Sequence, residues 1–396
     1  MDEKIIKIVN EAFWTDGQKV MNRLEEVSFD PMSCQEEFLM RLVRENATTT
    51  YGREHAFDHI RRMDEYRQYI PLSTYENYLP YVNRITRGEK NVLTAYLTEH
   101  ISRFDGYKSL PLSRWGVQSC YDYGFCMGFY LAGNQGLLTG GMTLNLLDNR
   151  IEQMSSGIHV GNILGRLLTK RSFDYNQVYV IPVDITQSSN KTEVLYLQAL
   201  YALRQENISL AICDHYDNMI QLLRYIEKHW PRLTEDIEKG NSYVSSDADR
   251  ANAIRKIMEG HHIGTQIIDQ LWPKLQCIMV FDVDRLTASF ELLRTYCGHQ
   301  VHFVFTGIGS PEGTFSTALH IDDPQTVLIP DSVFYEFKPK ESSNYDNLLT
   351  LDQLKIGHSY EMIVSTLSGL YRYKTEKTIL VVGRYHETPT VIIDKE

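Results

Sequence analysis

The sequence predicts an α/β protein, and three observations along the chain lead to that prediction. Apolar residues recur at three- and four-residue spacing in the first 70 residues, as they do in amphipathic helices. Buried strands and helices then alternate through the middle of the chain, which is the order of a layered α/β architecture. Short strands separated by glycine, proline or asparagine dominate the carboxy-terminal part.

Each part of the chain has its own pattern. Residues 1–95 are predicted to form a helical lead-in, since the helical spacing there ends at a run of threonines. Residues 96–310 are predicted to hold the α/β sheets, with VYVIPVDI (178–185) as a buried strand. Residues 311–396 are predicted to be rich in strands. We expect residues 1–396 to form a single domain made of these three parts.

Composition excludes several classes of protein. Hydrophobic residues make up 43% of the 396 residues and charged residues 23%, as in ordinary globular proteins. A formal net charge of -11 disfavours nucleic acid and anionic membranes as partners. No window approaches 18 apolar residues, and the amino terminus lacks a secretory signal, so we expect a cytoplasmic protein. Six cysteines are scattered without a C-x-x-C pair, and no metal site is predicted.

Two stretches carry residues suited to binding a ligand. HISRFDGYKSLPLSRWG (100–116) combines Gly106 and Lys108, but one glycine exposes too few amides for a phosphate loop, so a plain turn is favoured. FTGIGSPEGTF (305–315) directly follows a predicted strand, which is where α/β sheets bind ligands. Its Glu312 is suited to a cation or a ribose, and both a ligand site and a simple turn remain open for this loop.

A third stretch, GLYRYKTEK (369–377), lies between the apolar runs STLSGLY and TILVVG. Two apolar runs of this kind predict paired strands. The charged residues between them are therefore expected at the turn of a hairpin or at the rim of a site.

Several phrases of the sequence, taken together and in their order, resemble one family. This family is the Gretchen Hagen family of auxin-responsive acyl acid amido synthetases. The resemblance extends over most of the chain, and it rests on NATTTYGREHAF (46–57), YRQYIPLSTYENYLPYVNRITRGEKNVLT (66–94), YIEKHWPRLTEDIEKG (225–240), VFYEFKP (333–339), LKIGHSYEMIVSTLSGLYRY (354–373) and VGRYHETP (382–389).

The resemblance implies the large amino-terminal domain of an adenylate-forming enzyme, with sheet and helix subdomains and a β-rich final part. Family members use ATP and magnesium to convert a carboxylic acid into an acyl adenylate, and they then pass the acyl group to the amine of an amino acid. Because this chain ends at Glu396, the resemblance implies that the small mobile carboxy-terminal domain is absent.

The three ATP motifs of the family match this sequence only in part. In the first motif Lys108 and Pro111 persist, while the serine-, threonine- and glycine-rich stretch before them is missing. In the second motif Ser310, Glu312 and Gly313 match only with Pro311 inserted. That insertion shifts Glu312 by one position, which on an extended segment turns the side chain to the opposite face.

The third motif departs from the family at its most important position. Tyr371, Arg372 and Tyr373 match, but Glu376 replaces the glycine of the family, and Lys377 replaces the aspartate that accepts hydrogen bonds from the ATP ribose. An ammonium has three donors and no acceptor, so it cannot replace that carboxylate.

The sequence therefore predicts a divergent member that binds an acyl or carboxylic acid group and does not adenylate it with ATP. Such a protein is noncatalytic or acts on an activated acyl thioester, and neither ATP nor Mg is expected as a cofactor. Aromatic and cysteine side chains of 115–130 would line its pocket, with Cys120, Tyr121, Tyr123 and Cys126 as candidates for chemistry, although structural roles are favoured for them.

Two alternatives remain open. The first is an ATP-dependent ligase, which joins an acid to an amino acid or amine and is completed by non-standard residues or a partner chain. It would require ATP and Mg. The second is an interaction or scaffold subunit that pairs with another protein or with a second copy of itself.

Overall fold

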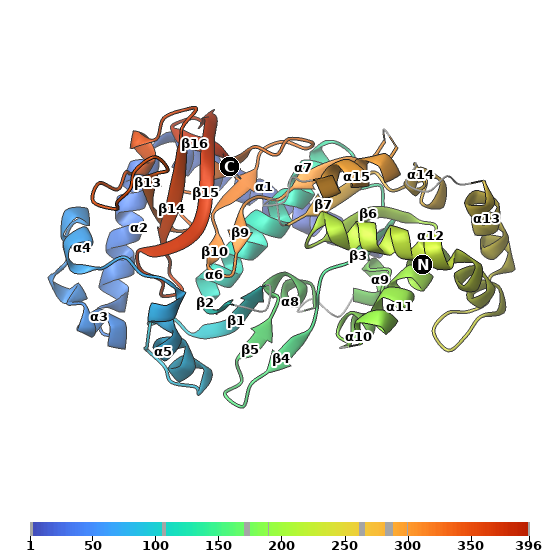
Figure 1. Cartoon of the computed structure of the whole chain (residues 1–396), viewed down its shortest axis with the longest axis horizontal. Helices are drawn as coiled ribbons and strands as arrows, with labels where there is room; N and C mark the ends of the chain where they lie inside the picture. The colour runs from blue at the N-terminus through green and yellow to red at the C-terminus, as the bar shows by residue number, and fades with distance from the viewer. Residues whose placement is uncertain are drawn as a thin grey trace.

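The computed structural model describes residues 3–104, 108–169, 175–188, 190–260, 266–281, 288–298 and 300–394. It has a mixed α/β fold, as predicted. An antiparallel sheet flanked by the first helices lies at the left of Figure 1, and a parallel sheet covered by helices lies at the right. Helix α1 (Glu3–Phe29) runs between the two halves.

The amino-terminal part consists of helices. Asp30 caps the second of them, because its carboxylate accepts a hydrogen bond from the amide of Ser33 at 3.1 Å and Pro31 follows at the first helical position. After α1 come α2 (Pro31–Asn46), α3 (Thr50–Glu54), the 3-10 turn η1 (Phe57–His59), α4 (Met63–Tyr69) and α5 (Tyr75–Thr86).

A continuous helical segment with a π-helical turn follows the first strands. It consists of α6 (Arg114–Ser119), the π-helix η2 (Cys120–Cys126) and α7 (Met127–Asn134). Helix α1 packs against it through glycines: a Cβ on Gly17 would lie 2.2 Å from the carbonyl oxygen of Cys126, and one on Gly133 would lie 2.5 Å from Trp14. These glycines therefore permit a close approach that no larger residue allows.

Two smaller sheets carry the central part of the chain. One has the order β2-β1-β5-β4 and contains β1 (Thr98–Phe104), β2 (Lys108–Ser113), β4 (Ile151–Gln153) and β5 (His159–Gly161). The other is entirely parallel, with the order β3-β6-β7-β8, and contains β3 (Met142–Asn145), β6 (Ile208–Cys213), β7 (Cys277–Val280) and β8 (His302–Phe305). Helices cover the parallel sheet, as is usual for such sheets. The helices of this part are α8 (Ile163–Thr169), α9 (Tyr175–Val178), α10 (Val183–Thr186), α11 (Lys191–Arg204), α12 (Tyr216–Lys239), α13 (Ala248–Glu259), α14 (Ile268–Leu271) and α15 (Ala288–Tyr296).

The predicted strand at 178–185 is wrong. Tyr179 forms only an isolated bridge to Thr143, and the helices α9 and α10 take up the two ends of the segment. Pro182 explains the difference, because it has no amide hydrogen for a strand ladder and it precedes the first turn of α10.

The carboxy-terminal part is an antiparallel sheet with the order β11-β12-β16-β15-β14-β13. A separate hairpin, β9 (Gly309–Ser310) with β10 (Gly313–Thr314), precedes this sheet. The six strands are β11 (Ser316–Ala318), β12 (Thr326–Leu328), β13 (Phe334–Pro339), β14 (Ser359–Ser365), β15 (Tyr373–Tyr385) and β16 (Thr388–Ile393), and the 3-10 turn η4 (Leu351–Gln353) lies between β13 and β14.

The charged residues of GLYRYKTEK do not form the hairpin turn. β14 and β15 pair as predicted, but the turn between them lies at 366–370. Arg372 directly precedes β15, and Lys374, Glu376 and Lys377 belong to that strand. The register of this pair shifts between Glu361 and Ile363. The extra residues of β15 bulge at that point, and Glu376 takes a left-handed φ of 62°.

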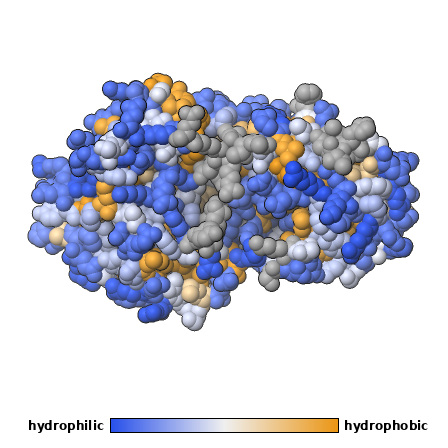
Figure 2. All heavy atoms as spheres, viewed as in Figure 1, coloured by the Kyte–Doolittle hydropathy of each residue, from blue (hydrophilic) through white to orange (hydrophobic). Residues whose placement is uncertain are grey.

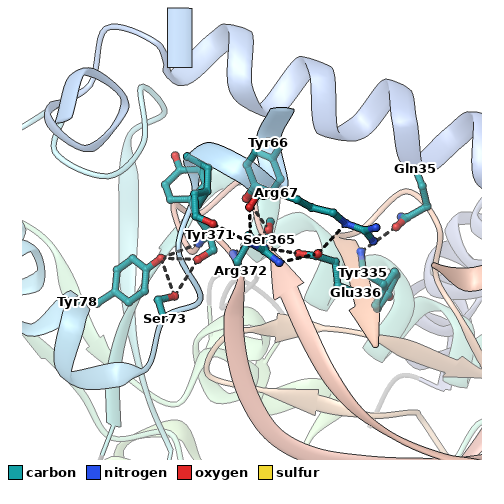
Figure 3. A network of polar contacts seen from close by, with 11 residues as sticks. Gln35, Tyr66, Arg67, Ser73, Tyr78, Tyr335, Glu336, Ser365, Tyr371 and Arg372 are labelled. Atoms are coloured by element: carbon teal, nitrogen blue, oxygen red, sulfur yellow. Dashed lines mark hydrogen bonds and ion pairs between the residues drawn. The ribbon is translucent and has the colours of Figure 1, made fainter. Parts of the chain in front are cut away.

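A buried polar network joins the helices to this sheet (Figure 3). The Arg372 guanidinium donates two hydrogen bonds to Glu336, at 2.8 and 3.1 Å, and Glu336 is 1% exposed. The same guanidinium donates to the backbone carbonyls of Arg67 and Ile70, at 2.9 and 2.8 Å. Arg67 donates in turn to Glu336 at 2.9 Å. One carboxylate and two guanidinium groups thus fix the chain after α4 against β13 and β15.

The surface is mostly polar. Figure 2 shows hydrophilic side chains over most of one face, with hydrophobic residues gathered in separate small patches. Within the ranges that the structure describes, no helix is both long enough and apolar enough to cross a membrane.

We expect Glu336→Ala to lower the free energy of unfolding by about 3 to 5 kcal/mol, because it leaves buried guanidinium groups without their carboxylate. Asp64→Ala is the control, since it breaks an exposed pair with Arg62 and should cost less than about 1 kcal/mol. Urea unfolding of the two variants measures the difference. Equal, small losses would mean that the network does not stabilise the fold.

Candidate functional site

Two cavities lie on either side of the hairpin β9–β10. The first, which we call the sheet-edge cavity, has a volume of about 50 Å³ and lies between the hairpin, η2 and the start of α8. The second, which we call the helix-side cavity, has a volume of about 230 Å³ and lies between the hairpin, α2, α6 and the 366–368 turn. Gly313 and Thr314 line both cavities, so the hairpin is their shared wall.

The sheet-edge cavity lies at the carboxyl ends of parallel strands. Phe281 directly follows β7, and Thr306 and Gly307 directly follow β8. Open α/β sheets bind their ligands at this edge. Ile163 and Leu164 add apolar surface, and no charged side chain is among the described residues that line the cavity. Such a lining is suited to an apolar group with an uncharged polar end.

A buried carboxylate supports one wall of this cavity. Asp214 follows β6 and accepts hydrogen bonds from the amide of Asp148 at 2.9 Å and from the Asn162 side chain at 2.8 Å. The Asn162 carbonyl oxygen accepts in turn from the amide of Leu164 at 2.9 Å. Burial raises the pKa of Asp214 to about 6, and those hydrogen bonds oppose the rise. Asp214 thus holds Asn162, which orients the start of α8.

Of the four candidates for chemistry in η2, only Cys120 lines the sheet-edge cavity. Its sulfur accepts a hydrogen bond from Thr314 at 3.3 Å, and burial raises the pKa of the thiol to about 11. A thiol with that pKa is protonated at neutral pH and is a poor nucleophile. Cys126 lies in the core beneath η2.

The two tyrosines of η2 make structural contacts. The Tyr121 hydroxyl donates to Asp16 at 3.0 Å. The Tyr123 hydroxyl donates to Asp331 at 2.8 Å and accepts from Arg23 at 3.2 Å, and burial raises its pKa well above the ordinary value. Both side chains therefore fasten η2 to neighbouring parts of the chain.

Residues from all three motif stretches meet at Lys108. The Lys108 ammonium lies 2.9 Å from a carboxylate oxygen of Glu376 and 3.9 Å from one of Glu312, and it lies 5.9 Å from the centre of the Tyr373 ring. Glu312 is 3% exposed and Glu376 is largely exposed. Burial raises the pKa of the Tyr373 hydroxyl, and the nearby Glu312 carboxylate raises it further.

The other positions that the resemblance assigned to a nucleotide site lie apart from Lys108 or have different partners. Tyr371 is buried and donates from its hydroxyl to the carbonyl of Leu93 at 2.6 Å, while Arg372 belongs to the Glu336 network. The Ser310 hydroxyl lines the sheet-edge cavity, and it has no hydrogen-bond partner among the described residues. Gly313 lies in the wall of both cavities, as noted above.

The remaining position, Lys377, ends the bulge of β15. It is half-buried, and its amide donates to the Thr375 hydroxyl at 3.2 Å. Gly106, the glycine of the first stretch, lies outside the residues that the structure describes.

Comparison with known proteins identifies the family. The GH3 family N-terminal domain matches residues 20–302, and the GH3 family central domain matches residues 326–394. The chain belongs to the GH3 family. This assignment confirms the resemblance that the sequence predicted.

The GH3 relatives include named ligases. The chain is 23% identical to indole-3-acetic acid-amido synthetase GH3.15 of Arabidopsis thaliana, over 95% of this chain and 69% of that protein. It is 22% identical to 4-substituted benzoates-glutamate ligase GH3.12 of Arabidopsis thaliana, over 93% of this chain and 69% of that protein. These relatives are acyl acid amido synthetases and acid–amino acid ligases.

The fold of the chain also resembles a solved GH3 structure. The match is to AtGH3.15 acyl acid amido synthetase in complex with 2,4-DB, with a TM-score of 0.81 and 20% identity over 96% of this chain and 70% of that one. At that identity the likeness establishes the fold.

Several residues around the cavities were not singled out from the sequence. Asn162 and Asp214 carried a signal, because each is a polar residue directly after a strand of an α/β fold. Arg41 lines the helix-side cavity beside Trp115, which belongs to the stretch 115–130 whose aromatic side chains were expected to line a pocket, but the two residues lie on helices far apart in the sequence. Spacing along the chain does not indicate that they meet.

We expect Glu376→Gly to be more stable than Glu376→Ala by about 1 kcal/mol. Both substitutions remove the pair with Lys108, but only glycine adopts the left-handed φ of 62° without a steric cost. Thermal unfolding at one pH measures the difference. An alanine variant as stable as the glycine variant would show that this backbone position is not strained.

We expect the stability that Asp214 confers to depend on pH. Its folded pKa of about 6 lies above the ordinary value of 3.8, so the folded state binds the proton more tightly, and stability falls as the pH rises through the folded pKa. Relative to Asp214→Asn, the wild type should gain about 1 kcal/mol of unfolding free energy between about pH 7 and about pH 5. Urea unfolding across that range measures the gain. The exposed control Asp346→Asn should leave the profile unchanged, and a pH-independent difference for Asp214→Asn would contradict the prediction.

Proposed function

We propose that this GH3 protein binds an acyl group in the sheet-edge cavity and does not adenylate it with ATP. The observation that carries the proposal is the position of Lys108, whose ammonium is held between the carboxylates of Glu376 and Glu312. If Lys108 were to hold a phosphate, its ammonium would have to be available to the phosphate oxygens. Here two carboxylates already balance its charge.

Electrostatics supports the second half of the proposal. A triphosphate approaching Lys108 would also approach Glu312 and Glu376, and its several negative charges would be repelled at short range. The aspartate that the family uses for the ribose is replaced by Lys377, whose side chain offers donors only. Mg that binds with a nucleotide takes only one or two protein carboxylates, so the poor fit to ATP rests on the paired Lys108 and on Lys377. On that ground the residues present do not fit ATP with Mg, and we assign no step to them.

The lining of the sheet-edge cavity supports the first half of the proposal. Its apolar walls are suited to an acyl tail, and the Ser310 and Asn162 side chains are uncharged. Without a cation in that lining, a neutral thioester or ester is held more readily than a free carboxylate. A volume of about 50 Å³ favours a short acyl chain. The amine that would accept the acyl group remains undefined.

The runner-up is an ATP-dependent ligase that joins an acid to an amino acid or amine, and the names of the relatives favour it. It requires that Lys108 exchange its two carboxylate partners for phosphate. A scaffold role, with a protein partner or a second copy, is the third candidate. Under each of these three candidate functions we propose that the protein is cytoplasmic.

ATP–pyrophosphate exchange across a panel of carboxylic acids tests the lack of adenylation. We expect no exchange above background for the wild type, with the GH3.15 protein of Arabidopsis thaliana as the active control. Lys377→Asp alone should not restore exchange, because Lys108 keeps both of its carboxylate partners. Robust exchange by the wild type would overturn this half of the proposal in favour of the ligase.

Calorimetry with a short acyl thioester tests the acyl site. We expect saturable binding of S-butyryl-N-acetylcysteamine and at least tenfold weaker binding by Gly124→Leu. A Cβ on Gly124 lies 3.5 Å from the Phe281 ring, so a leucine there fills the cavity. The control Gly260→Leu is exposed at the end of α13 and should bind as the wild type does. Equal binding by both variants would show that the thioester does not bind in the sheet-edge cavity and would overturn this half of the proposal.

A further inference from the structure

The helix-side cavity contains a cation without a counter-charge. Arg41 of α2 lines this cavity, and its guanidinium forms no ion pair within the described part of the chain. Its Nε atom is buried and also lacks a hydrogen-bond partner there. An unpaired buried donor is unfavourable, so an acceptor that reaches this guanidinium would stabilise it.

The other charged groups around this cavity are already paired. Arg23 lies 3.2 Å from a carboxylate oxygen of Asp122 and 3.0 Å from one of Asp331. Glu312, which also lines this cavity, lies 3.9 Å from the Lys108 ammonium. Arg41 is therefore the one charge among the described lining residues that a ligand can neutralise.

Aromatic rings hold the Arg41 guanidinium in place. Its central carbon lies 5.5 Å from the centre of the Phe38 ring and 6.0 Å from that of Trp115. Trp115 is 47% exposed, which puts an aromatic ring beside both the guanidinium and solvent. A planar guanidinium fixed in this way is pre-organised to bind a carboxylate through two parallel hydrogen bonds.

The carboxylates on the walls limit the charge of the ligand. A second negative group would lie near Asp122, Asp331 or Glu312 and would be repelled. A cavity of about 230 Å³ has room for several water molecules, and hence for a small organic molecule. The Ser119 hydroxyl, which is buried and unpartnered among the described residues, supplies a further polar group at the wall.

We propose that the helix-side cavity is a second binding site, separate from the acyl cavity, for a small molecule bearing a single carboxylate, which Arg41 receives beside Trp115. The two sources of that chemistry are a plain monocarboxylic acid and a zwitterionic amino acid. The inference does not depend on the proposed acyl function. None of the three residues Arg41, Trp115 and Ser119 lines the sheet-edge cavity.

Fluorescence and calorimetry on the full chain test the site with three probes of one size at constant ionic strength. Sodium propionate and L-alanine carry the carboxylate, and propionamide is the uncharged control. We expect at least one carboxylate probe to change the tryptophan fluorescence saturably and to bind at least tenfold more tightly than propionamide. Binding of propionate alone identifies a plain acid, and binding of alanine with equal or higher affinity identifies an amino acid. Saturable binding of neither carboxylate, or equal binding of propionamide, overturns the proposal.

Variants then locate the site. Arg41→Gln should weaken the bound probe at least tenfold, whereas Arg44→Gln, which changes an exposed arginine on the same helix, should leave binding unchanged. Trp115→Phe should abolish the fluorescence change while calorimetric affinity stays within about threefold, because phenylalanine keeps a ring beside the guanidinium. Gly124→Leu, which fills the acyl cavity, should not affect this binding. An Arg41→Gln variant that binds as the wild type does, with an unchanged circular dichroism spectrum, refutes the site.

Discussion

The buried contact between Arg372 and Glu336 is the interaction on which the rest of this structure depends. Arg372 adopts a left-handed φ of 47°, a conformation that costs a non-glycine residue about 1 to 2 kcal/mol. The bidentate pair with Glu336, together with hydrogen bonds to two backbone carbonyls, holds the residue in that conformation. Because Arg372 directly precedes β15, the same contact sets where that strand enters the sheet (Figure 3).

The position of β15 in turn decides what surrounds Lys108. Tyr373 is the first residue of the strand, and the bulge three residues later carries Glu376 to the ammonium. From the other side, the hairpin β9–β10 brings Glu312 to the same group. A lysine placed between two strands that are each fixed elsewhere in the fold cannot easily leave its carboxylates. The electrostatic character of the family's nucleotide position in this protein is therefore a consequence of how the sheet is anchored.

The sequence predicted the structure correctly where the spacing of apolar residues along the chain matches the way the folded protein buries them. The α/β class follows from periodicities that also describe how β6, β7 and β8 are buried on both faces. It was wrong at 178–185, where an apolar run with high strand propensity contains Pro182, and the proline starts a helix instead. For the charged residues of GLYRYKTEK the sequence left open a hairpin turn or the rim of a site, and the turn is excluded because β15 continues through a bulge that alternation does not reveal.

The candidate site, like the fold, could be predicted from the sequence only in part. The three motif stretches could be found in the sequence because each has an unusual composition, and Lys108, Glu312 and Glu376 do meet in the structure. Their pairing could not be predicted, since it depends on a hairpin and a bulge that fix the directions of individual side chains. Nothing in the sequence marked Arg41 as a binding residue either, because many amphipathic helices carry an arginine on a partly apolar face.

The hairpin β9–β10 explains why an uncharged cavity and a charged cavity can lie so close together. Its two strands pair through only two residues each, yet it is fastened on both sides. The Thr314 hydroxyl donates to the Cys120 sulfur at 3.3 Å, and the Thr314 carbonyl accepts from Ser332 at 2.8 Å. Pro311 and Glu312 form the tip, and the proline restricts its backbone further. A wall this thin and this constrained separates an uncharged lining from a charged one, so the two cavities differ in electrostatic character.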